Sequence, residues 1–231
     1  MSAREVAYQS IDVVASEEGL AQLHQLGART VPVMAKGDDY VNAISLQNVN
    51  ALLGLDAGSE PSLTPAELAQ RLDGVLSAAA RYVRQLPDDQ MSLELPGRPR
   101  LYSHLTHHIF QIACGFMTVT KGGELTSELL AAAPGDEIVS FAQIADAGEA
   151  VRREMLDWWE SAGADTDFNA TVQTYYGPQT CHEVLKRTTW HAAQHARQVM
   201  FILQEQGMEP DGPLGERDLA GLPLPKEVWD G

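Results

Sequence analysis

Five of the seven histidines in the chain fall into two clusters that lie far apart in the sequence. One cluster holds His104, His107 and His108, and the other holds His191 and His195. On a helix, at about 100° per residue, the second pair lies about 40° apart and the first cluster spans about 100°. Each cluster therefore presents its imidazoles on one face of the helix that carries it.

The face that carries the second cluster also carries Val184, Thr188, Gln198 and Ile202, and this stripe should turn inward. An uncharged imidazole inside a helical bundle needs partners for both ring nitrogens, and a divalent metal ion supplies one of them. Two histidines at i and i+4, with a third from a neighbouring helix, make an open metal site with room for water or substrate. The pair alone is weak evidence for a metal site, because most such pairs are exposed or hydrogen-bonded. The second histidine cluster favours the metal site.

The composition is that of a globular protein, with 44% hydrophobic and 21% charged residues in 231. Acidic residues number 32 against 16 basic ones, so the net charge of -16 opposes binding to nucleic acid or to an anionic membrane. Cys114 and Cys181 form no CxxC pair. We find no leader-like N-terminus and no apolar run of about 18 residues, and therefore expect a cytoplasmic protein.

Most of the chain has helical periodicity. Helices are expected over 65–86, 100–120, 141–161 and 181–206, the first capped by Thr64 and the last by a capping box of Thr180 and Glu183. They predict a mainly α fold with a four-helix bundle over 65–209. A linker is expected at 57–64, and residues 210–231, rich in Pro and Leu, are expected to form an extended tail that packs on the surface or bridges to a partner subunit.

The first 56 residues differ from the rest. Strands are expected at 6–14, 30–34 and 40–42, with helices at 17–26 and 45–53, which gives the order βαββα. This order, with Pro32 after Thr30 and Val31, resembles the distal part of a glutaredoxin-like or thioredoxin-like domain. The family's CxxC half is missing, so redox catalysis is not expected. The strands at 6–14 and 30–34 should pair directly through a right-handed βαβ crossover, or else borrow a strand from a partner chain.

The segments SHLTHHIFQ and TTWHAAQHARQ resemble the DinB-like (DinB/YfiT) superfamily of metal-binding four-helix proteins, and the resemblance spans about 65–206. It implies an up-and-down bundle with a long crossover, zinc or in some members nickel, and frequent homodimers. By this resemblance, His191 and His195 match two metal ligands and His108 best matches the third. His104, one turn earlier, is the fallback.

Three functions follow from these patterns. The first is a metal-dependent enzyme that uses a low-molecular-weight thiol, glutathione, to attack a small electrophile in transfer, isomerisation or dehalogenation, with zinc, nickel or iron as the metal. Thr30, Val31 and Pro32 would then form a thiol-binding clamp. The second is a hydrolase that uses metal-bound water, helped by Glu183, Tyr175 or Tyr176. The third is a non-catalytic, metal-stabilised stress or binding protein.

Overall fold

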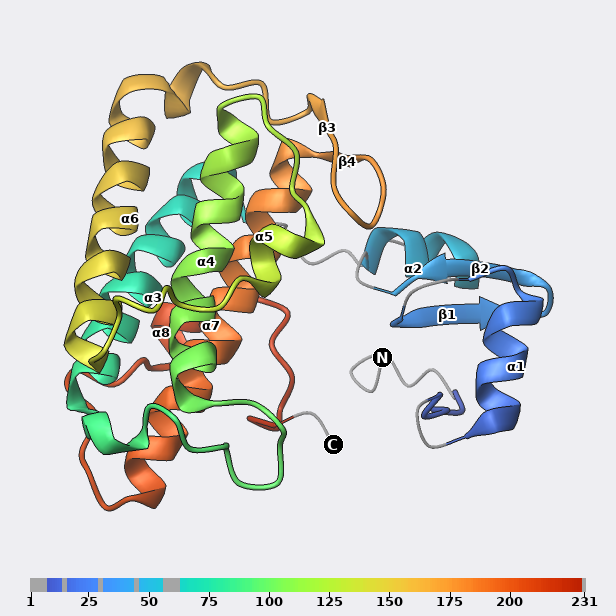
Figure 1. Cartoon of the computed structure of the whole chain (residues 1–231). Helices are drawn as coiled ribbons and strands as arrows, with labels where there is room; N and C mark the ends of the chain where they lie inside the picture. The colour runs from blue at the N-terminus through green and yellow to red at the C-terminus, as the bar shows by residue number, and fades with distance from the viewer. Residues whose placement is uncertain (1–7, 14–15, 29–30, 44–45, 56–62, 230–231) are drawn as a thin grey trace. The chain divides into compact units, whose positions relative to one another are not determined.

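The computed structural model describes residues 8–13, 16–28, 31–43, 46–55 and 63–229 (Figure 1). The chain divides into two compact units, Met1–Pro61 and Ser62–Gly231. The fold is mainly α-helical, with two small two-stranded sheets in the described residues. Within these residues, none of the helices combines the length and the apolar character that crossing a membrane requires.

The N-terminal unit contains a short hairpin between two helices. Helix α1 (Glu17–Gln25) is followed by strands β1 (Val33–Lys36) and β2 (Asp39–Asn42) and by helix α2 (Leu46–Leu53). The strands are antiparallel, paired from Val33 with Asn42 to Lys36 with Asp39. Gly37, with a φ of 63°, provides the left-handed conformation that this tight turn requires.

The three-stranded sheet expected in this unit is not formed in the described residues. Residues 8–13 are not in a strand, and the rest of the expected strand at 6–14 lies outside the described residues. The two strands that do pair are joined by a two-residue turn, and closing so short a loop costs less entropy than closing a crossover. The second expected strand begins at Val33, after a cis Val31–Pro32 peptide bond, and Thr30 lies outside the described residues.

Four long helices form the C-terminal unit, and each lies within about two residues of its expected bounds. They are α3 (Pro65–Gln85), α4 (Tyr102–Thr120), α6 (Phe141–Ala162) and α7 (Cys181–Glu205). The shorter elements are η2 (Asp88–Gln90), α5 (Ser127–Ala131), η3 (Gly163–Asp165), β3 (Thr171–Val172), β4 (Gln179–Thr180) and α8 (Glu216–Leu219). The β3–β4 pair was not expected from the sequence, because strands of two residues leave no periodic signal.

Side-chain caps fix the starts of α3, α6 and α7, whereas α4 begins after Leu101 without one. Thr64 and Glu67 form a complete capping box on α3. On α7 only half of the expected box is present: Thr180 accepts from the Glu183 N–H at 3.2 Å, while the Glu183 carboxylate lies 3.6 Å from Lys186. Lys186 is one turn away on the same helix and competes for that carboxylate.

The long helices pack as a bundle in which α3 and α4 lie diagonally and each contacts both α6 and α7. Helices α3 and α7 run in the same direction, because Leu63 contacts His182 near their starts and Leu68 contacts Thr189 further along. Large buried side chains fill the space between the helices. They include Leu72, Leu76, Tyr82, Ile109, Phe116, Phe141 and Met155.

Helices α4 and α6 also share a direction. Phe110 lies against Gly148, and one turn or more further along both helices Phe116 packs edge-on to Trp158 at 5.5 Å. Direction therefore does not alternate at every helix, as it would in a simple up-and-down bundle. The crossover of residues 121–140, which includes α5, carries the chain back along the bundle to the start of α6 (Figure 1).

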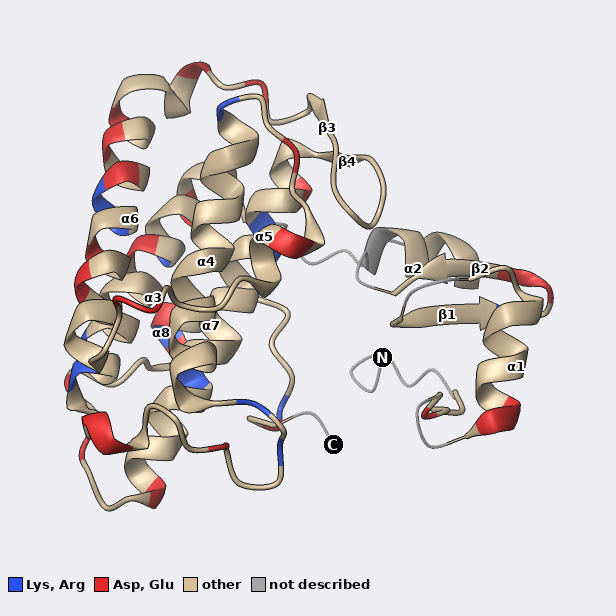
Figure 2. Cartoon of the chain, viewed as in Figure 1, with Lys and Arg blue, Asp and Glu red and all other residues tan. Residues whose placement is uncertain are grey.

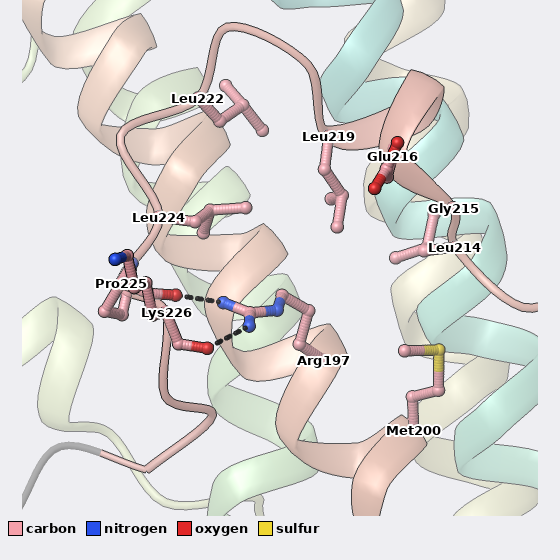
Figure 3. A pocket seen from close by; sticks show the side chains of 10 residues that line it. All are labelled: Arg197, Met200, Leu214, Gly215, Glu216, Leu219, Leu222, Leu224, Pro225 and Lys226. Atoms are coloured by element: carbon pink, nitrogen blue, oxygen red, sulfur yellow. Dashed lines mark hydrogen bonds between the residues drawn. The ribbon is translucent and has the colours of Figure 1, made fainter.

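The C-terminal tail is fastened to α3 and α7. Tyr82 donates its hydroxyl to the Gly212 carbonyl at 3.0 Å, and Arg197 donates to the carbonyls of Pro225 at 2.9 Å and Lys226 at 3.3 Å (Figure 3). The tail thus packs on the surface of its own bundle. The expectation that the tail is extended is wrong at α8, a single helical turn that begins after Gly215.

Candidate metal centre

Helices α4 and α7 bring three histidines together inside the bundle. One ring nitrogen each from His108, His191 and His195 lies within 4.8 Å of the other two. The ring centroid of His108 lies 5.2 Å from that of His191 and 5.2 Å from that of His195. The centroids of His191 and His195 lie 4.8 Å apart. Three partly buried imidazoles from two helices are thus close enough to hold one metal ion.

The two α7 rings meet through their Nε2 atoms, which lie 3.1 Å apart. Two nitrogens bound to one zinc ion at about 2.1 Å in tetrahedral directions are about 3.4 Å apart. The observed spacing is thus close to that of a shared cation, and it also suits a hydrogen bond between the rings. The position of His108 supports the shared cation, because a hydrogen bond between the two α7 rings does not involve the third ring that lies beside them.

Outer hydrogen bonds fix two of the three rings. His108 donates from Nδ1 to the Leu130 carbonyl at 2.8 Å, and His195 donates from Nδ1 to Oε1 of Gln198 at 2.6 Å. Both rings therefore keep Nε2 unprotonated and available as a ligand, which is the arrangement that metal-binding histidines commonly have. Nδ1 of His191 is buried and has no hydrogen-bond partner among the described residues. The donor set fits a divalent metal ion that accepts nitrogen ligands.

The surroundings keep the three imidazoles uncharged. Burial lowers the pKa of His108 to about 4 and that of His195 to about 3, and it lowers the pKa of His191 well below its ordinary value. The positive charges of Arg100 and Arg187 act on all three pKa values in the same direction. Neutral rings at physiological pH are the form that binds metal.

The wall on the α7 side of the cluster is aromatic. Trp190 packs against His191 with the ring centroids 5.5 Å apart. Arg187, one turn before His191, lies with its guanidinium 5.0 Å from the centre of the Tyr176 ring and donates to the Tyr175 hydroxyl at 3.2 Å. On this side, a large ring packs on His191, and one turn earlier a cation packs on two tyrosines.

The tail is connected to the cluster by hydrogen bonds. The side-chain amide of Gln198 donates to the Val228 carbonyl at 3.2 Å, and that of Gln194 donates to the same carbonyl at 2.6 Å. Because the amide of Gln198 is held on one side by the tail, its oxygen is directed at His195 on the other. The tail thereby helps to set the orientation of a candidate ligand.

The other expected site residues lie elsewhere. His104, the fallback ligand, is exposed and lies outside the cluster, whereas His108 lies within it. His107 is partly buried, and burial lowers its pKa. Val31 and Pro32 belong to the N-terminal unit, where both are exposed and the Pro32 carbonyl accepts from the Ala43 N–H at 2.9 Å.

Sequence reasoning missed two features of the site. Arg187 precedes His191 by four residues, so the spacing that paired the two α7 histidines also placed this arginine on their stripe. Leu130 contributes a backbone carbonyl from the crossover, and no sequence pattern marks such a contact.

Comparison of the chain with models of known protein families gives no match, and a comparison with curated proteins gives no similar relative. The geometry of the site is therefore the basis for the function proposed below.

Proposed function

We propose that the chain is a metal-dependent enzyme that uses a low-molecular-weight thiol, glutathione, to attack a small electrophilic substrate. The proposed metal is zinc, with nickel or iron as alternatives, and the proposed ligands are His108, His191 and His195. The proposed reaction is a transfer, an isomerisation or a dehalogenation.

The observation that carries this proposal is the set of three neutral imidazoles that converge from α4 and α7. Neutral ligands leave the full charge on a divalent ion, which can then hold a thiol as thiolate at neutral pH. Three protein ligands also leave a coordination position open, as in catalytic rather than structural zinc sites.

The chain's own residues hold the ligands and shape the site. Leu130 and Gln198 fix the tautomers of His108 and His195 through their oxygens. Trp190 supplies apolar surface beside the His191 ring, and Tyr176 packs against Arg187 one turn before it.

We propose, too, that the helical unit is DinB-like and that the N-terminal unit is a truncated glutaredoxin-like module whose residues Thr30, Val31 and Pro32 bind the thiol peptide. The positions of the histidines on α4 and α7 support the first proposal, and the βαββα pattern expected from the sequence suggested the second. A homodimer is part of the same proposal.

A thermal-shift experiment on the full chain tests the thiol function. We expect glutathione to raise the midpoint of unfolding of the zinc-loaded protein by several degrees. S-methylglutathione, whose sulfur cannot form a thiolate, should raise it less. Neither compound should act after removal of zinc by a chelator.

The variants His195→Ala and His104→Ala are a matched pair for this test, because only His195 belongs to the cluster. Stabilisation should be lost in the first and kept in the second. Equal effects of glutathione and its S-methyl form would refute the binding of glutathione as a thiolate. Stabilisation by zinc alone would favour a non-catalytic binding protein.

A further inference from the structure

Two arginines lie near the candidate metal ligands along the chain, one on the α7 stripe and one just before the start of α4. Arg187 stands four residues before His191 on α7, and Arg100 stands eight residues before His108, just ahead of the first residue of α4. Asp73 and Arg84 of α3 pair with Arg152 and Asp146 of α6, so α3 and α7 run opposite to α6 and α4. Arg187 therefore lies toward one end of the cluster and Arg100 toward the other. The histidines are thus flanked by two guanidinium groups.

Neither guanidinium group has a carboxylate partner within the described part of the chain, although acidic residues are twice as numerous as basic ones. Figure 2 shows that the acidic residues are distributed over both units. Arg84 and Arg152 each form an ion pair with an aspartate at 2.6 Å. The charges of Arg84 and Arg152 are thus neutralised, whereas no carboxylate of the described residues neutralises Arg187 or Arg100.

Both arginines are also partly removed from water. Nε of Arg187 is buried without a hydrogen-bond partner among the described residues, and its other contacts are the Tyr175 hydroxyl and the Tyr176 ring. Arg100 is partly buried, with one long contact of 3.5 Å to the His104 carbonyl. Burial of a guanidinium costs free energy, and a bound anion that accepts its hydrogen bonds offsets this cost.

We infer that the three-histidine site binds a small molecule through a carboxylate group that Arg187 and Arg100 recognise beside the metal. The planar fork of arginine matches the two oxygens of a carboxylate, whereas a neutral amide or alcohol of the same shape offers no charge to it. This inference rests on the proposed function in one respect, because the metal centre determines where the carboxylate binds. It does not require that the protein bind a thiol.

Calorimetric titration of the zinc-loaded full chain with succinate and with succinamide tests this site, because the two molecules have similar shape and differ in charge. We expect succinate to bind at least about tenfold more tightly, the value of one hydrogen bond to a charged group. Arg187→Gln and the double variant with Arg100→Gln should reduce this preference to about one.

Arg153→Gln is the matched control, because Arg153 is exposed on α6 and its replacement removes the same charge from the bundle. It should leave the preference for succinate unchanged. Zinc content near one per chain in every variant shows that the site is intact. Equal binding of the two probes, or a preference for succinate that survives in the double variant, overturns the inference.

A second pair of probes separates this inference from the proposed function. 3-Mercaptopropionate and 3-mercaptopropan-1-ol both carry a thiol, and the cobalt-loaded protein reports sulfur binding as a charge-transfer absorption band. If neither thiol gives the band while succinate keeps its preference, the thiol function fails and the carboxylate site stands. If both thiols give the band with equal affinity, the thiol function stands and the carboxylate site fails.

Discussion

His195 and Gln198 share a hydrogen bond of 2.6 Å on α7, in which the ring Nδ1 donates to the amide Oε1. Because the amide oxygen only accepts, this bond holds the ring in the tautomer with its proton on Nδ1. Nε2 is then free to bind a cation. The same amide is held by the Val228 carbonyl, so the orientation of a candidate ligand depends on a residue 33 positions away in the sequence.

Replacement of His195 by alanine should abolish metal binding. Two imidazoles that remain cannot match the affinity of three, so metal content measured by elemental analysis should fall from about one per chain to near zero. His104→Ala, which removes an exposed histidine from α4, should retain the metal. Full metal content in the His195 variant would show that the cluster is a hydrogen-bonded core.

Replacement of Gln198 by leucine should weaken metal binding without removing a ligand. The loss of the acceptor frees the His195 ring to change tautomer and orientation, and partners of this kind contribute about 10-fold to 100-fold in metal affinity. Competition with a chromophoric chelator measures the change. Gln204→Leu, at an exposed position of the same helix, serves as the comparison and should leave the affinity as it is.

Replacement of Arg197 by glutamine should loosen the tail. The variant loses the hydrogen bonds to Pro225 and Lys226, so amide hydrogen exchange in residues 222–229 should become about tenfold faster. Arg217→Gln, on the exposed side of α8, should leave exchange unchanged. An unchanged rate in the Arg197 variant would mean that the leucines around the adjacent pocket hold the tail by themselves (Figure 3).

Two glycines in helices should respond to alanine in opposite directions. At Gly148, the added Cβ would lie 2.4 Å from the Phe110 ring, so α4 and α6 must separate, which costs about 1–3 kcal/mol of stability. At Gly74, on α3, the added Cβ meets nothing within 4 Å, and alanine should stabilise the helix by about 0.4–1 kcal/mol. Denaturant unfolding measures both, and a neutral Gly148→Ala would contradict the close packing of these helices.

The metal-free protein should lose stability as the pH falls below about 6.5. The pKa of His108 is about 4 and that of His195 about 3 in the folded protein, below the value of 6.5 expected for the unfolded chain. The unfolded chain therefore takes up protons first, and the stability present above pH 6.5 is lost progressively toward these lower values. Urea unfolding of chelator-treated protein between pH 7.5 and 4.5 checks this, and a flat profile would rule out buried neutral rings.

The long helices could be predicted from the sequence because each carries its own periodicity, and three of them also carry a capping residue at the start. Thr64 with Pro65 marks the start of α3, and Gly207 follows the end of α7 with a φ of 74°. The pair His191 and His195 could be placed on one face for the same reason. These features depend only on local geometry.

The features that could not be predicted depend on contacts between distant segments. The Leu130 carbonyl reaches His108 because the crossover packs on α4, and Val228 reaches Gln198 because the tail returns along α7. The strand expected over residues 6–14 was placed from its β-rich composition, and that composition does not state which segment will pair with it.

The return of the tail to α7 sets an order of events during synthesis of the protein. All three histidines have been made once translation has reached residue 195, but the Val228 carbonyl that steadies Gln198 is still to come. A nascent chain in that interval has the ligands without the contact that orients one of them. We expect the cation to be held at full strength only after residue 228 has been added and the tail has folded back.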